Sequence, residues 1–574
     1  MEPKDLSKKA HKASSSHKND QLFFAALRYT PLISLVLALF EGSHPMIVSL
    51  TPLMFLRRAE KLFPHKVGVV CEGRRFTYAE FGQRVHRLSN ALASLPVEKG
   101  NVVAYLGHNC HRLLEAYYGV LQTGAILLPL NVRLTANDFR YILDHSEARV
   151  LFLESEFLPA IDSIRKQLQR EVLFVILDAG ASEGWLCDRN YDELLQLASS
   201  EVFANVIEDE DDVAELFYTS GTTAQPKGVM LTHRNLFLHA MSVMWALKND
   251  DSEVQLHTIP LFHANGWGAT HTITGAGGTH VMLQRFEPKR LLGLVQQERV
   301  TTFNLVPTMA TMLLQEPAIK EHDLSSLRLI HMGGSAMPRA LLRELTERIG
   351  CEVSCGYGLT ETSPVLTIAL MKSHLREEGD AFYRRAAMTG LELPGTEVRV
   401  VDEHGHDVPR DGETVGEIIT RGNIVMKGYW KQPEETAQAI RSGWLYTGDM
   451  ATMDSEGYVL IVDRKKDIIL RGGENISSIE VEKALYSHPA VLECAVIAVP
   501  DEKWGEAPKA FVALREGMVC EPEGLRRHCK ALLAGYKVPA SIEIVAALPK
   551  GGTGKIQKKL LRAKYWHGQE KQIH

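Results

Sequence analysis

The sequence predicts an α/β fold that is divided into more than one domain, and two observations support this. From Arg75 onward, short apolar runs rich in β-branched residues alternate with segments of helical periodicity, a pattern typical of sheets covered by helices. The chain is also 574 residues long, which exceeds what one hydrophobic core usually serves. We therefore expect two or three units, the last of them a compact unit of about a hundred residues.

The elements of the first part follow one another regularly. Thr77 is a suitable N-cap for a helix over 77–94, in which Phe81, Val85, Leu88 and Leu92 recur at helical spacing. The strand over 214–218 is expected to lead into a polar loop, which is followed directly by a helix over 235–246. The other expected elements are strands at 102–105, 150–153 and 172–177 and a helix at 110–123.

A second group of elements begins near residue 457. Two apolar runs, 457–462 and 468–470, flank the charged segment 463–467, which from pattern alone reads as a hairpin turn. The compact C-terminal unit then contains expected helices at 479–486 and 523–533 and expected strands at 491–499 and 510–514.

Composition narrows the classes of protein. Hydrophobic residues make up 45% and charged residues 23%, as in a soluble globular protein. The 64 Lys and Arg are balanced by 70 Asp and Glu, so the net charge of -6 gives no reason to expect a nucleic-acid partner. The eight cysteines are scattered, which favours a reduced compartment without structural zinc, and Cys351 and Cys355 are expected to be buried thiols.

The N-terminal residues 1–45 are expected to form a flexible extension. The apolar run 31–40 is too short to span a bilayer, so we expect no transmembrane anchor. We expect a cytoplasmic protein, with a mitochondrial or plastid location as the alternative if residues 1–45 act as a targeting segment. The last residues are not a peroxisomal Ser-Lys-Leu signal. The sequence leaves a homodimer open.

The most informative segment, residues 218–229, combines several hydroxyls with glycine and one lysine. The hydroxyls can donate hydrogen bonds, Gly221 lets backbone amides approach a ligand, and Lys227 supplies a positive charge, so the segment indicates a polyphosphate-binding loop. The lysine precedes the second glycine here, whereas Walker A has the opposite order, which disfavours P-loop kinases and GTPases. A polar surface turn is the alternative. The hydroxyl-bearing residues are Thr219, Ser220, Thr222 and Thr223.

Three further segments carry side chains suited to nucleotide chemistry. In 356–362, glycines around Tyr357 open the backbone for a flat ligand, and Thr360 and Glu361 can contact a phosphate and its magnesium ion. Segment 443–449 ends on Asp449, a carboxylate able to accept hydrogen bonds from ribose hydroxyls. Segment 548–556 is a Gly-rich loop that presents Lys555, as suits a charge needed only transiently. Taken singly, segment 356–362 also fits a tight turn with a core tyrosine. Segment 548–556 also fits a tail that carries a solvated lysine.

In this order, and together with Arg421-Gly422 and Asp463-Arg464, the four segments resemble the adenylate-forming enzymes, the superfamily of acyl-CoA synthetases, luciferases and peptide-synthetase adenylation domains. The resemblance covers about residues 50–565, and segments 260–267, 356–365, 372–375 and 472–478 are most similar to medium- and long-chain fatty acyl-CoA synthetases. It implies a large N-terminal domain of mixed and parallel sheets flanked by helices, and a small mobile α+β C-terminal domain. The implied boundaries are an extension at 1–45, an AMP-binding domain at 46–463, a hinge at 464–466, a lid domain at 467–565 and a tail at 566–574.

The resemblance also implies roles for residues at the nucleotide. Lys555 would bridge the acid's carboxylate and the α-phosphate, Thr360 would bind the α-phosphate, and Glu361 with Thr222 would ligate Mg²⁺. The expected ATP-binding residues are Thr219, Ser220, Gly221, Thr222, Thr223, Lys227, Gly334, Ser335, Tyr357, Asp449 and Arg464.

For the second half of the reaction, the resemblance implies that the C-terminal domain swings about the turn from Arg464 to Lys466. The strand that carries Gly472 and Gly473 would then replace the Lys555 loop at the site and help to admit CoA.

For the acid, the resemblance implies a tunnel gated by Trp267. The expected wall carries no lysine or arginine, which disfavours dicarboxylic substrates, and a core histidine and tryptophan are the structural alternative. The expected pocket residues are His263, Asn265, Trp267, Phe303 and Gly333.

The implied activity is ATP- and Mg²⁺-dependent conversion of a medium- or long-chain fatty acid to an acyl-adenylate, with pyrophosphate released, followed by transfer to CoA. The alternatives are an aryl or phenylpropanoid acid:CoA ligase, a fatty acyl-AMP ligase that loads an acyl-carrier protein, and a non-catalytic binding relative. The presence of both Lys555 and Glu361 favours an active enzyme.

Overall fold

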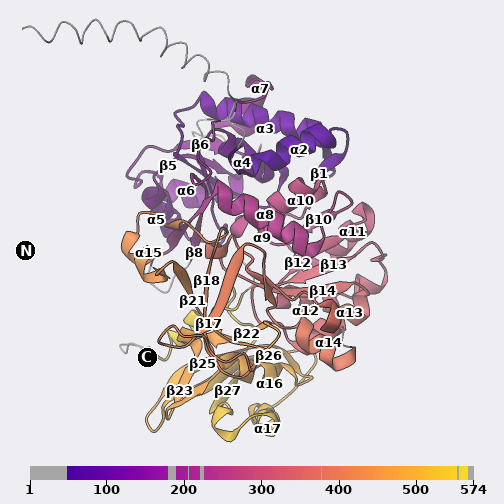
Figure 1. Cartoon of the computed structure of the whole chain (residues 1–574), viewed down its shortest axis with the longest axis vertical. Coiled ribbons are helices and arrows are strands. Elements are labelled where there is room, and N and C mark those ends of the chain that lie inside the picture. The colour runs from indigo at the N-terminus through magenta and orange to yellow at the C-terminus, as the bar shows by residue number, and fades with distance from the viewer. Residues whose placement is uncertain are drawn as a thin grey trace, which may run out of the picture. The chain divides into compact units, whose positions relative to one another are not determined.

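The structure is a computed structural model that describes residues 48–178, 189–204, 206–219, 225–375, 378–551 and 555–566. Its contacts divide the chain into Met1–Ser49 and Leu50–His574, and the helices and strands of the described residues lie in the second unit. Two large sheets, a smaller antiparallel sheet and a C-terminal sheet form its framework (Figure 1). In the described part of the chain, no helix has both the length and the apolar character needed to cross a bilayer.

The first large sheet is parallel from β14 to β1 and has antiparallel strands at both edges. In spatial order its strands are β16 (Leu391–Glu392), β15 (Thr367–Ile368), β14 (Glu352–Tyr357), β13 (Leu329–Met332), β12 (Thr302–Leu305), β10 (Val254–His257), β11 (Thr279–Met282), β1 (Val67–Cys71) and β2 (Arg74–Thr77).

The second large sheet is parallel from β8 to β7, with β9 and β19 antiparallel at one edge. Its order is β19 (Gly428–Tyr429), β9 (Lys227–Thr232), β8 (Val213–Thr219), β4 (Ile126–Pro129), β3 (Val102–Leu106), β5 (Ala148–Leu153), β6 (Leu173–Ile176) and β7 (Arg189–Asn190).

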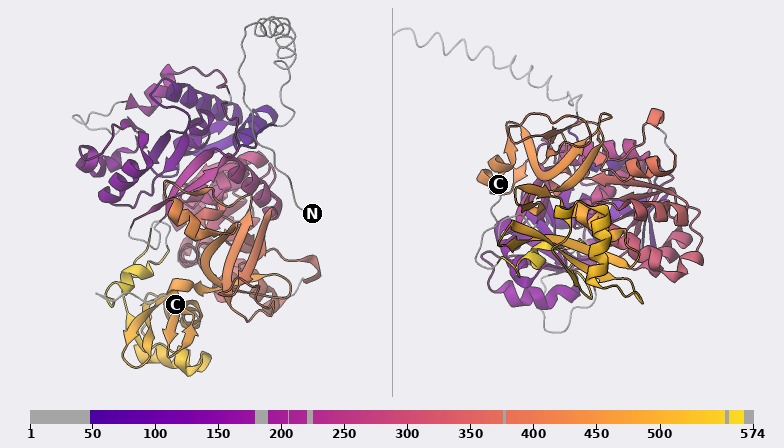
Figure 2. Two further views of the ribbon diagram at one scale, coloured as in Figure 1. Left: turned by 60° about the vertical axis from the view of Figure 1, so that its left-hand side comes forward. Right: turned by 90° about the horizontal axis from the view of Figure 1, so that it is seen from below.

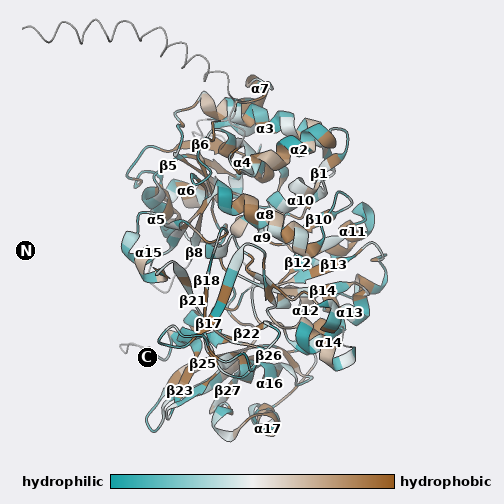
Figure 3. Cartoon of the chain, in the orientation of Figure 1, coloured by the Kyte–Doolittle hydropathy of each residue, from teal (hydrophilic) through white to brown (hydrophobic). Residues whose placement is uncertain are grey.

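Helices cover both faces of the parallel strands. The strands therefore have nearly continuous apolar sequences. On β3, Val103 and Tyr105 pack with α3 and α4, whereas Ala104 and Leu106 pack on the opposite face with α5 and α6. Figure 3 shows apolar residues on the strands and polar residues on outward helix faces. The helices up to residue 439 are α2 (Leu53–Leu62), α3 (Tyr78–Ala93), α4 (His111–Gln122), α5 (Ala136–Ser146), α6 (Leu158–Arg165), α7 (Tyr191–Leu197), α8 (His233–Leu247), α9 (Ala264–Trp267), α10 (Ala269–Ala276), α11 (Pro288–Glu298), α12 (Pro307–Gln315), α13 (Arg339–Ile349), α14 (Gly379–Ala386) and α15 (Pro433–Ala439).

The remaining strands form two separate sheets. The antiparallel sheet contains β17 (Thr396–Val401), β18 (Gly416–Gly422), β21 (Trp444–Met453), β20 (Ile440–Arg441) and β22 (Val459–Arg464). The C-terminal sheet contains β24 (Glu474–Ile476), β23 (Ile469–Arg471), β26 (Gly505–Leu514), β25 (Val491–Asp501) and β27 (Ser541–Ile544). Its helices are α16 (Ser478–Tyr486), α17 (Pro522–Leu532) and α18 (Lys558–Arg562), and Figure 2 shows this segment in orange to yellow.

The α/β class predicted from the sequence is confirmed, and two local predictions are corrected. The expected strand, loop and helix after residue 213 contain an additional strand, because β9 pairs antiparallel with β8 before α8 begins at a Thr232 capping box. The charged segment is not a hairpin turn, because β22 pairs with β21 whereas β23 joins β24 and β26 in another sheet. Cys351 and Cys355 are buried free thiols, as expected.

Candidate functional site

The predicted phosphate loop joins the paired strands β8 and β9. Thr219 ends β8 and is the ladder partner of Lys227, which begins β9, whereas Ser220, Gly221, Thr222 and Thr223 lie outside the described residues. The Lys227 ammonium forms an ion pair with Glu435 on α15 and lies 5.1 Å from the centroid of the Tyr429 ring. An anionic ligand that bound Lys227 would have to displace Glu435.

Glu361 lies beside this region, after the end of β14. Its carboxylate accepts a hydrogen bond of 3.0 Å from the Tyr429 hydroxyl, and burial raises its pKa. No lysine or arginine in the described ranges forms an ion pair with it. A buried carboxylate that has a raised pKa and no direct cationic partner is a suitable ligand for a metal ion. The neighbouring Thr360 is buried.

Tyr357, Asp449 and Arg464 come together from three strands. The Tyr357 hydroxyl donates to Asp449 Oδ2 at 2.8 Å, and Arg464 Nε lies 3.4 Å from Asp449 Oδ1. The last two residues are ladder partners in β21 and β22, so backbone pairing sets their spacing. Gly358 cannot carry a side chain, because a Cβ there would lie 1.7 Å from the Pro364 carbonyl oxygen.

Lys555 reaches from the C-terminal loop to the glycines after β13. A Cβ on Gly334 would lie 3.0 Å from Lys555 Cε, so the two are in contact. Burial and the nearby Arg464 lower the Lys555 pKa to about 8, with Asp449 opposing the shift. Burial, assisted by the Lys555 charge, also lowers the His263 pKa to about 3. Ser335, the next residue after Gly334, is exposed.

Trp267 is packed against the other side of these glycines. A Cβ on Gly333 would lie 3.2 Å from the indole, and one on Gly334 would lie 3.4 Å from it. The ring also makes an edge contact with His331, with 6.2 Å between centroids. The indole therefore stands between the Lys555 loop and the interior.

The backbone that carries Trp267 is unusual, because residues 264–268 all have positive φ, from 43° to 81°. Asn265 is fully buried and holds this turn: its Oδ1 accepts from Gly268 N at 2.7 Å and its Nδ2 donates to Glu215 Oε2 at 2.7 Å. The other Glu215 oxygen lies 2.7 Å from His271 Nε2. A buried polar network thus fixes the position of the indole.

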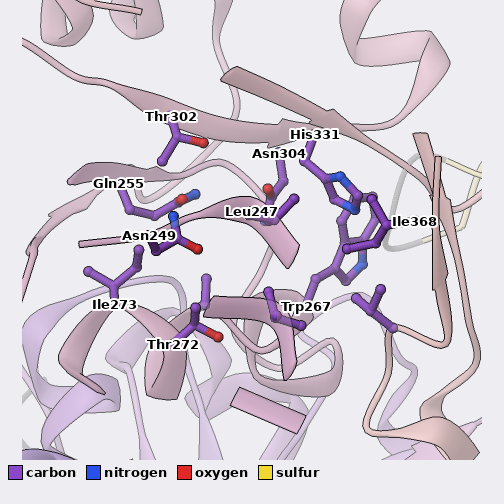
Figure 4. A pocket seen from close by; sticks show the side chains of 13 residues that line it. Leu247, Asn249, Gln255, Trp267, Thr272, Ile273, Thr302, Asn304, His331 and Ile368 are labelled. Carbon is purple, nitrogen blue, oxygen red and sulfur yellow. The ribbon is translucent and has the colours of Figure 1, made fainter. Parts of the chain in front are cut away.

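A small pocket lies behind Trp267 (Figure 4). Alternate residues of β12, Thr302 and Asn304, face it, whereas Phe303 packs with the apolar residues of α11 to α13 on the other face of the sheet. Phe303 therefore does not line this pocket, and neither do His263, Asn265 and Gly333. Its lining residues are Val243, Leu247, Asn249, Gln255, Trp267, Ala269, Thr272, Ile273, Thr302, Asn304, His331, Val365 and Ile368.

The predicted hinge and CoA residues lie at the start of the C-terminal segment. Lys466 is in the short 3-10 helix Lys465–Asp467, and burial lowers its pKa. Gly472 and Gly473 form the turn between β23 and β24 with φ values of 60° and 89°. A Cβ on Gly472 would lie 2.7 Å from the Trp504 ring, so this turn requires glycine.

Known proteins are similar to this chain in sequence and in fold. Residues 56–430 match the AMP-binding enzyme family, and residues 480–555 match the AMP-binding enzyme C-terminal domain. The chain belongs to the AMP-binding enzyme family. This AMP-binding enzyme is 40% identical over 521 residues to a long-chain-fatty-acid–CoA ligase of Thermus thermophilus, covering 89% of this chain and 95% of the relative.

Two more proteins that are similar to this AMP-binding enzyme are CoA ligases, and their names give different acids. It is 36% identical over 537 residues to a peroxisomal butyrate–CoA ligase of Arabidopsis thaliana, covering 90% and 93% of the two chains. It also superposes on the crystal structure of an anthranilate CoA ligase in complex with anthranoyl-AMP, with a TM-score of 0.82, 28% identity and coverage of 90% and 98%.

Sequence reasoning missed several residues of the site in this AMP-binding enzyme. Tyr429 and Glu435 are about two hundred residues from Lys227, and no local pattern connects them. Thr302 and Asn304 carried a signal, because they alternate with Phe303 and Leu305 and polar residues are unusual in a strand buried on both faces.

Proposed function

We propose that the chain is an AMP-forming acid:CoA ligase acting on a medium- or long-chain monocarboxylic acid. ATP and the acid would give an acyl-adenylate and pyrophosphate, and CoA would then displace AMP. The main support is the position of Lys555, in contact with Gly334 and next to Asp449, Arg464 and His263. There, one cation can face both the nucleotide and the carboxylate of an acid in the pocket behind Trp267.

The proposed chemistry needs positive charge more than it needs a nucleophile from the protein. A carboxylate attacking the α-phosphate brings two anions together, and the transition state spreads negative charge over the phosphoryl oxygens. The Lys555 cation would stabilise that charge in a site that is already formed. Tyr357, Asp449 and Arg464 would orient the nucleoside, and Lys227 would release Glu435 to hold the departing pyrophosphate.

Glu361 is the described residue that fits a magnesium ion. Its carboxylate is an oxygen ligand of the kind Mg²⁺ prefers, it has a raised pKa, and the Tyr429 hydroxyl orients it. When bound, Mg²⁺ would neutralise charge on the phosphates. Thr222 remains proposed as a second contact.

For thioester formation, we propose that the C-terminal segment rotates about residues 464–466. Lys555 would leave, and the turn at Gly472 and Gly473 would approach the adenylate with CoA. Withdrawal of Lys555 is compatible with the second step, because a thiolate attacks a carbonyl carbon whose leaving group is AMP.

A pyrophosphate-release screen tests the proposal, using saturated acids of 4 to about 18 carbons and flat aromatic acids. We expect ATP-, Mg²⁺- and acid-dependent release, with acyl-CoA formed when CoA is added. Release with aromatic acids alone would refute the aliphatic assignment, and transfer to an acyl-carrier protein but not to CoA would refute the CoA assignment. No release with any acid would refute acid activation.

A further inference from the structure

The end of the pocket farthest from Trp267 carries several polar side chains, which an unsubstituted fatty acid would not require. Figure 4 shows Gln255, Asn249 and Thr302 at this end, beside the apolar Ile273, with Trp267 and His331 at the other. Near the indole the lining includes the apolar side chains of Val243, Val365 and Ile368. An acyl chain that entered past Trp267 would therefore meet an apolar section and then a polar one.

Several of these polar side chains make no hydrogen bond to the described part of the protein. Thr302 is 3% exposed and Asn304 is 8% exposed, and within the described part of the chain neither side chain makes a hydrogen bond. The buried Asn249 Oδ1 also has no partner. By contrast, the Thr272 hydroxyl is satisfied by the Gly268 carbonyl at 2.8 Å. Buried polar groups are normally paired, so unpaired ones that face one pocket indicate a ligand that supplies the partner.

The strand spacing gives the depth of these groups. Val306 follows β12, and its Cγ1 would lie 3.1 Å from a Cβ built on Gly334, the glycine that Lys555 contacts. Val306 therefore lies at the same depth as Lys555. At roughly 3.3 Å per residue, Asn304 lies roughly 7 Å deeper than this level and Thr302 roughly 13 Å deeper. An extended chain advances about 1.2 Å per bond. A group that meets these residues is then roughly six to eleven bonds from the carboxyl carbon.

The chemistry of the lining limits what that group can be. The pocket contains amides, hydroxyls and a histidine but no lysine, arginine or carboxylate. A second carboxylate would be buried without a cation, which is strongly unfavourable. A hydroxyl or carbonyl oxygen can pair with the amides and hydroxyls without carrying charge.

We propose that the preferred substrate is a medium-chain aliphatic acid that bears a hydroxyl or carbonyl oxygen roughly six to eleven bonds from its carboxyl carbon. This inference rests on the proposed acid:CoA ligase function and specifies its substrate class. Asn304 and Thr302 determine the specificity for that oxygen, with Asn249 and Gln255 next to them.

Matched pairs of acids test the inference with the full-length enzyme. We would measure kcat/KM for pyrophosphate release with octanoate against 8-hydroxyoctanoate, and with decanoate against 10-hydroxydecanoate. We expect the hydroxy acid of each pair to be favoured at least about tenfold, the factor that corresponds to one net hydrogen bond. Butanoate against 4-hydroxybutanoate is the control pair, because its hydroxyl stops short of Asn304 and should give no gain.

Two variants assign the preference to the pocket. Thr302→Val and Asn304→Leu should each reduce or reverse the hydroxy-acid preference while the KM for ATP is retained. Thr301→Val is the matched control, because the Thr301 hydroxyl bonds to Glu253 and does not line the pocket. It should leave the ratio within each pair unchanged.

The outcomes separate this inference from the proposed function. A wild-type enzyme that uses plain acids as well as their hydroxy partners overturns the inference and leaves the ligase function standing. A stronger preference for hydroxyphenyl acids overturns the aliphatic assignment. An unchanged preference in both pocket variants overturns the role of Thr302 and Asn304. If no acid supports pyrophosphate release, the proposed function itself fails.

Discussion

Replacing Lys555 by methionine should separate the two half-reactions. The substitution keeps the length of the side chain and removes the charge that lies against Gly334 and near Asp449. A unit charge about 4 Å from a developing anion contributes about 4 kcal/mol at an effective dielectric constant of 20. Because Lys555 is only half-buried, we expect a loss nearer to that of one oxyanion-hole donor, about 10² to 10³-fold in adenylation.

The assay measures each step by itself. Single-turnover pyrophosphate release reports adenylation, and thioester formation from supplied acyl-adenylate and CoA reports the second step. Lys550→Met is the control on the same loop, because Lys550 pairs with Glu493 at 2.7 Å. We expect it to leave adenylation nearly unchanged. Equal losses in both half-reactions for Lys555→Met, or an equal adenylation loss in the control, would refute the assignment of Lys555 to the first step.

The remaining predictions concern pH, the pocket and stability. Because the Lys555 pKa is lowered to about 8, the cation is lost as pH rises through that value, so kcat/KM for adenylation should decline above about pH 8. Lys555→Arg should move the decline to higher pH, and an unmoved profile would assign it to another group. Trp267→Ala should broaden the chain-length profile, measured by pyrophosphate release, with little change in the KM for ATP; an unchanged profile would make the indole a core residue only. Glu215→Leu leaves the Asn265 amide and His271 Nε2 without their partner and should cost about 1–3 kcal/mol for each unpaired group. A melting temperature equal to that of wild type would contradict this.

The sequence predicted best the elements whose signals are local. Helix α3 begins at the Thr77 cap, as expected, and its capping box is formed with Glu80 three residues later. Strand β9 was missed because residues 227–229 were interpreted as the end of a phosphate loop and residues 230–232 were given no element. Their pairing with β8 is an interaction between segments, and periodicity in so short a run does not predict it.

Candidate site residues were found from the sequence where chemistry is encoded in a motif, and no signal indicated them where distant segments meet. Asp449 and Arg464 were predicted to hold the ribose and Lys555 to bridge the acid and the α-phosphate, and the structure brings the three near one another. The counter-ion of Lys227 comes from α15, so only the tertiary fold shows its ion pair with Glu435. Phe303 was assigned to the pocket without a predicted strand at 302–305, so the direction of its side chain was not considered.

The left-handed backbone conformation of residues 264–268 also limits which substitutions can change the shape of the pocket behind Trp267. A side chain at position 267 must suit a backbone with a φ of 62°, a region in which β-branched residues are outliers and asparagine or glycine are tolerated. Libraries that place valine or isoleucine there would lose stability before any change in selectivity could be measured. Variation at Thr302 and Asn304 has no such limit, because β-branched and apolar residues suit an extended strand. Changes in acid selectivity are therefore more accessible through the strand than through the tryptophan.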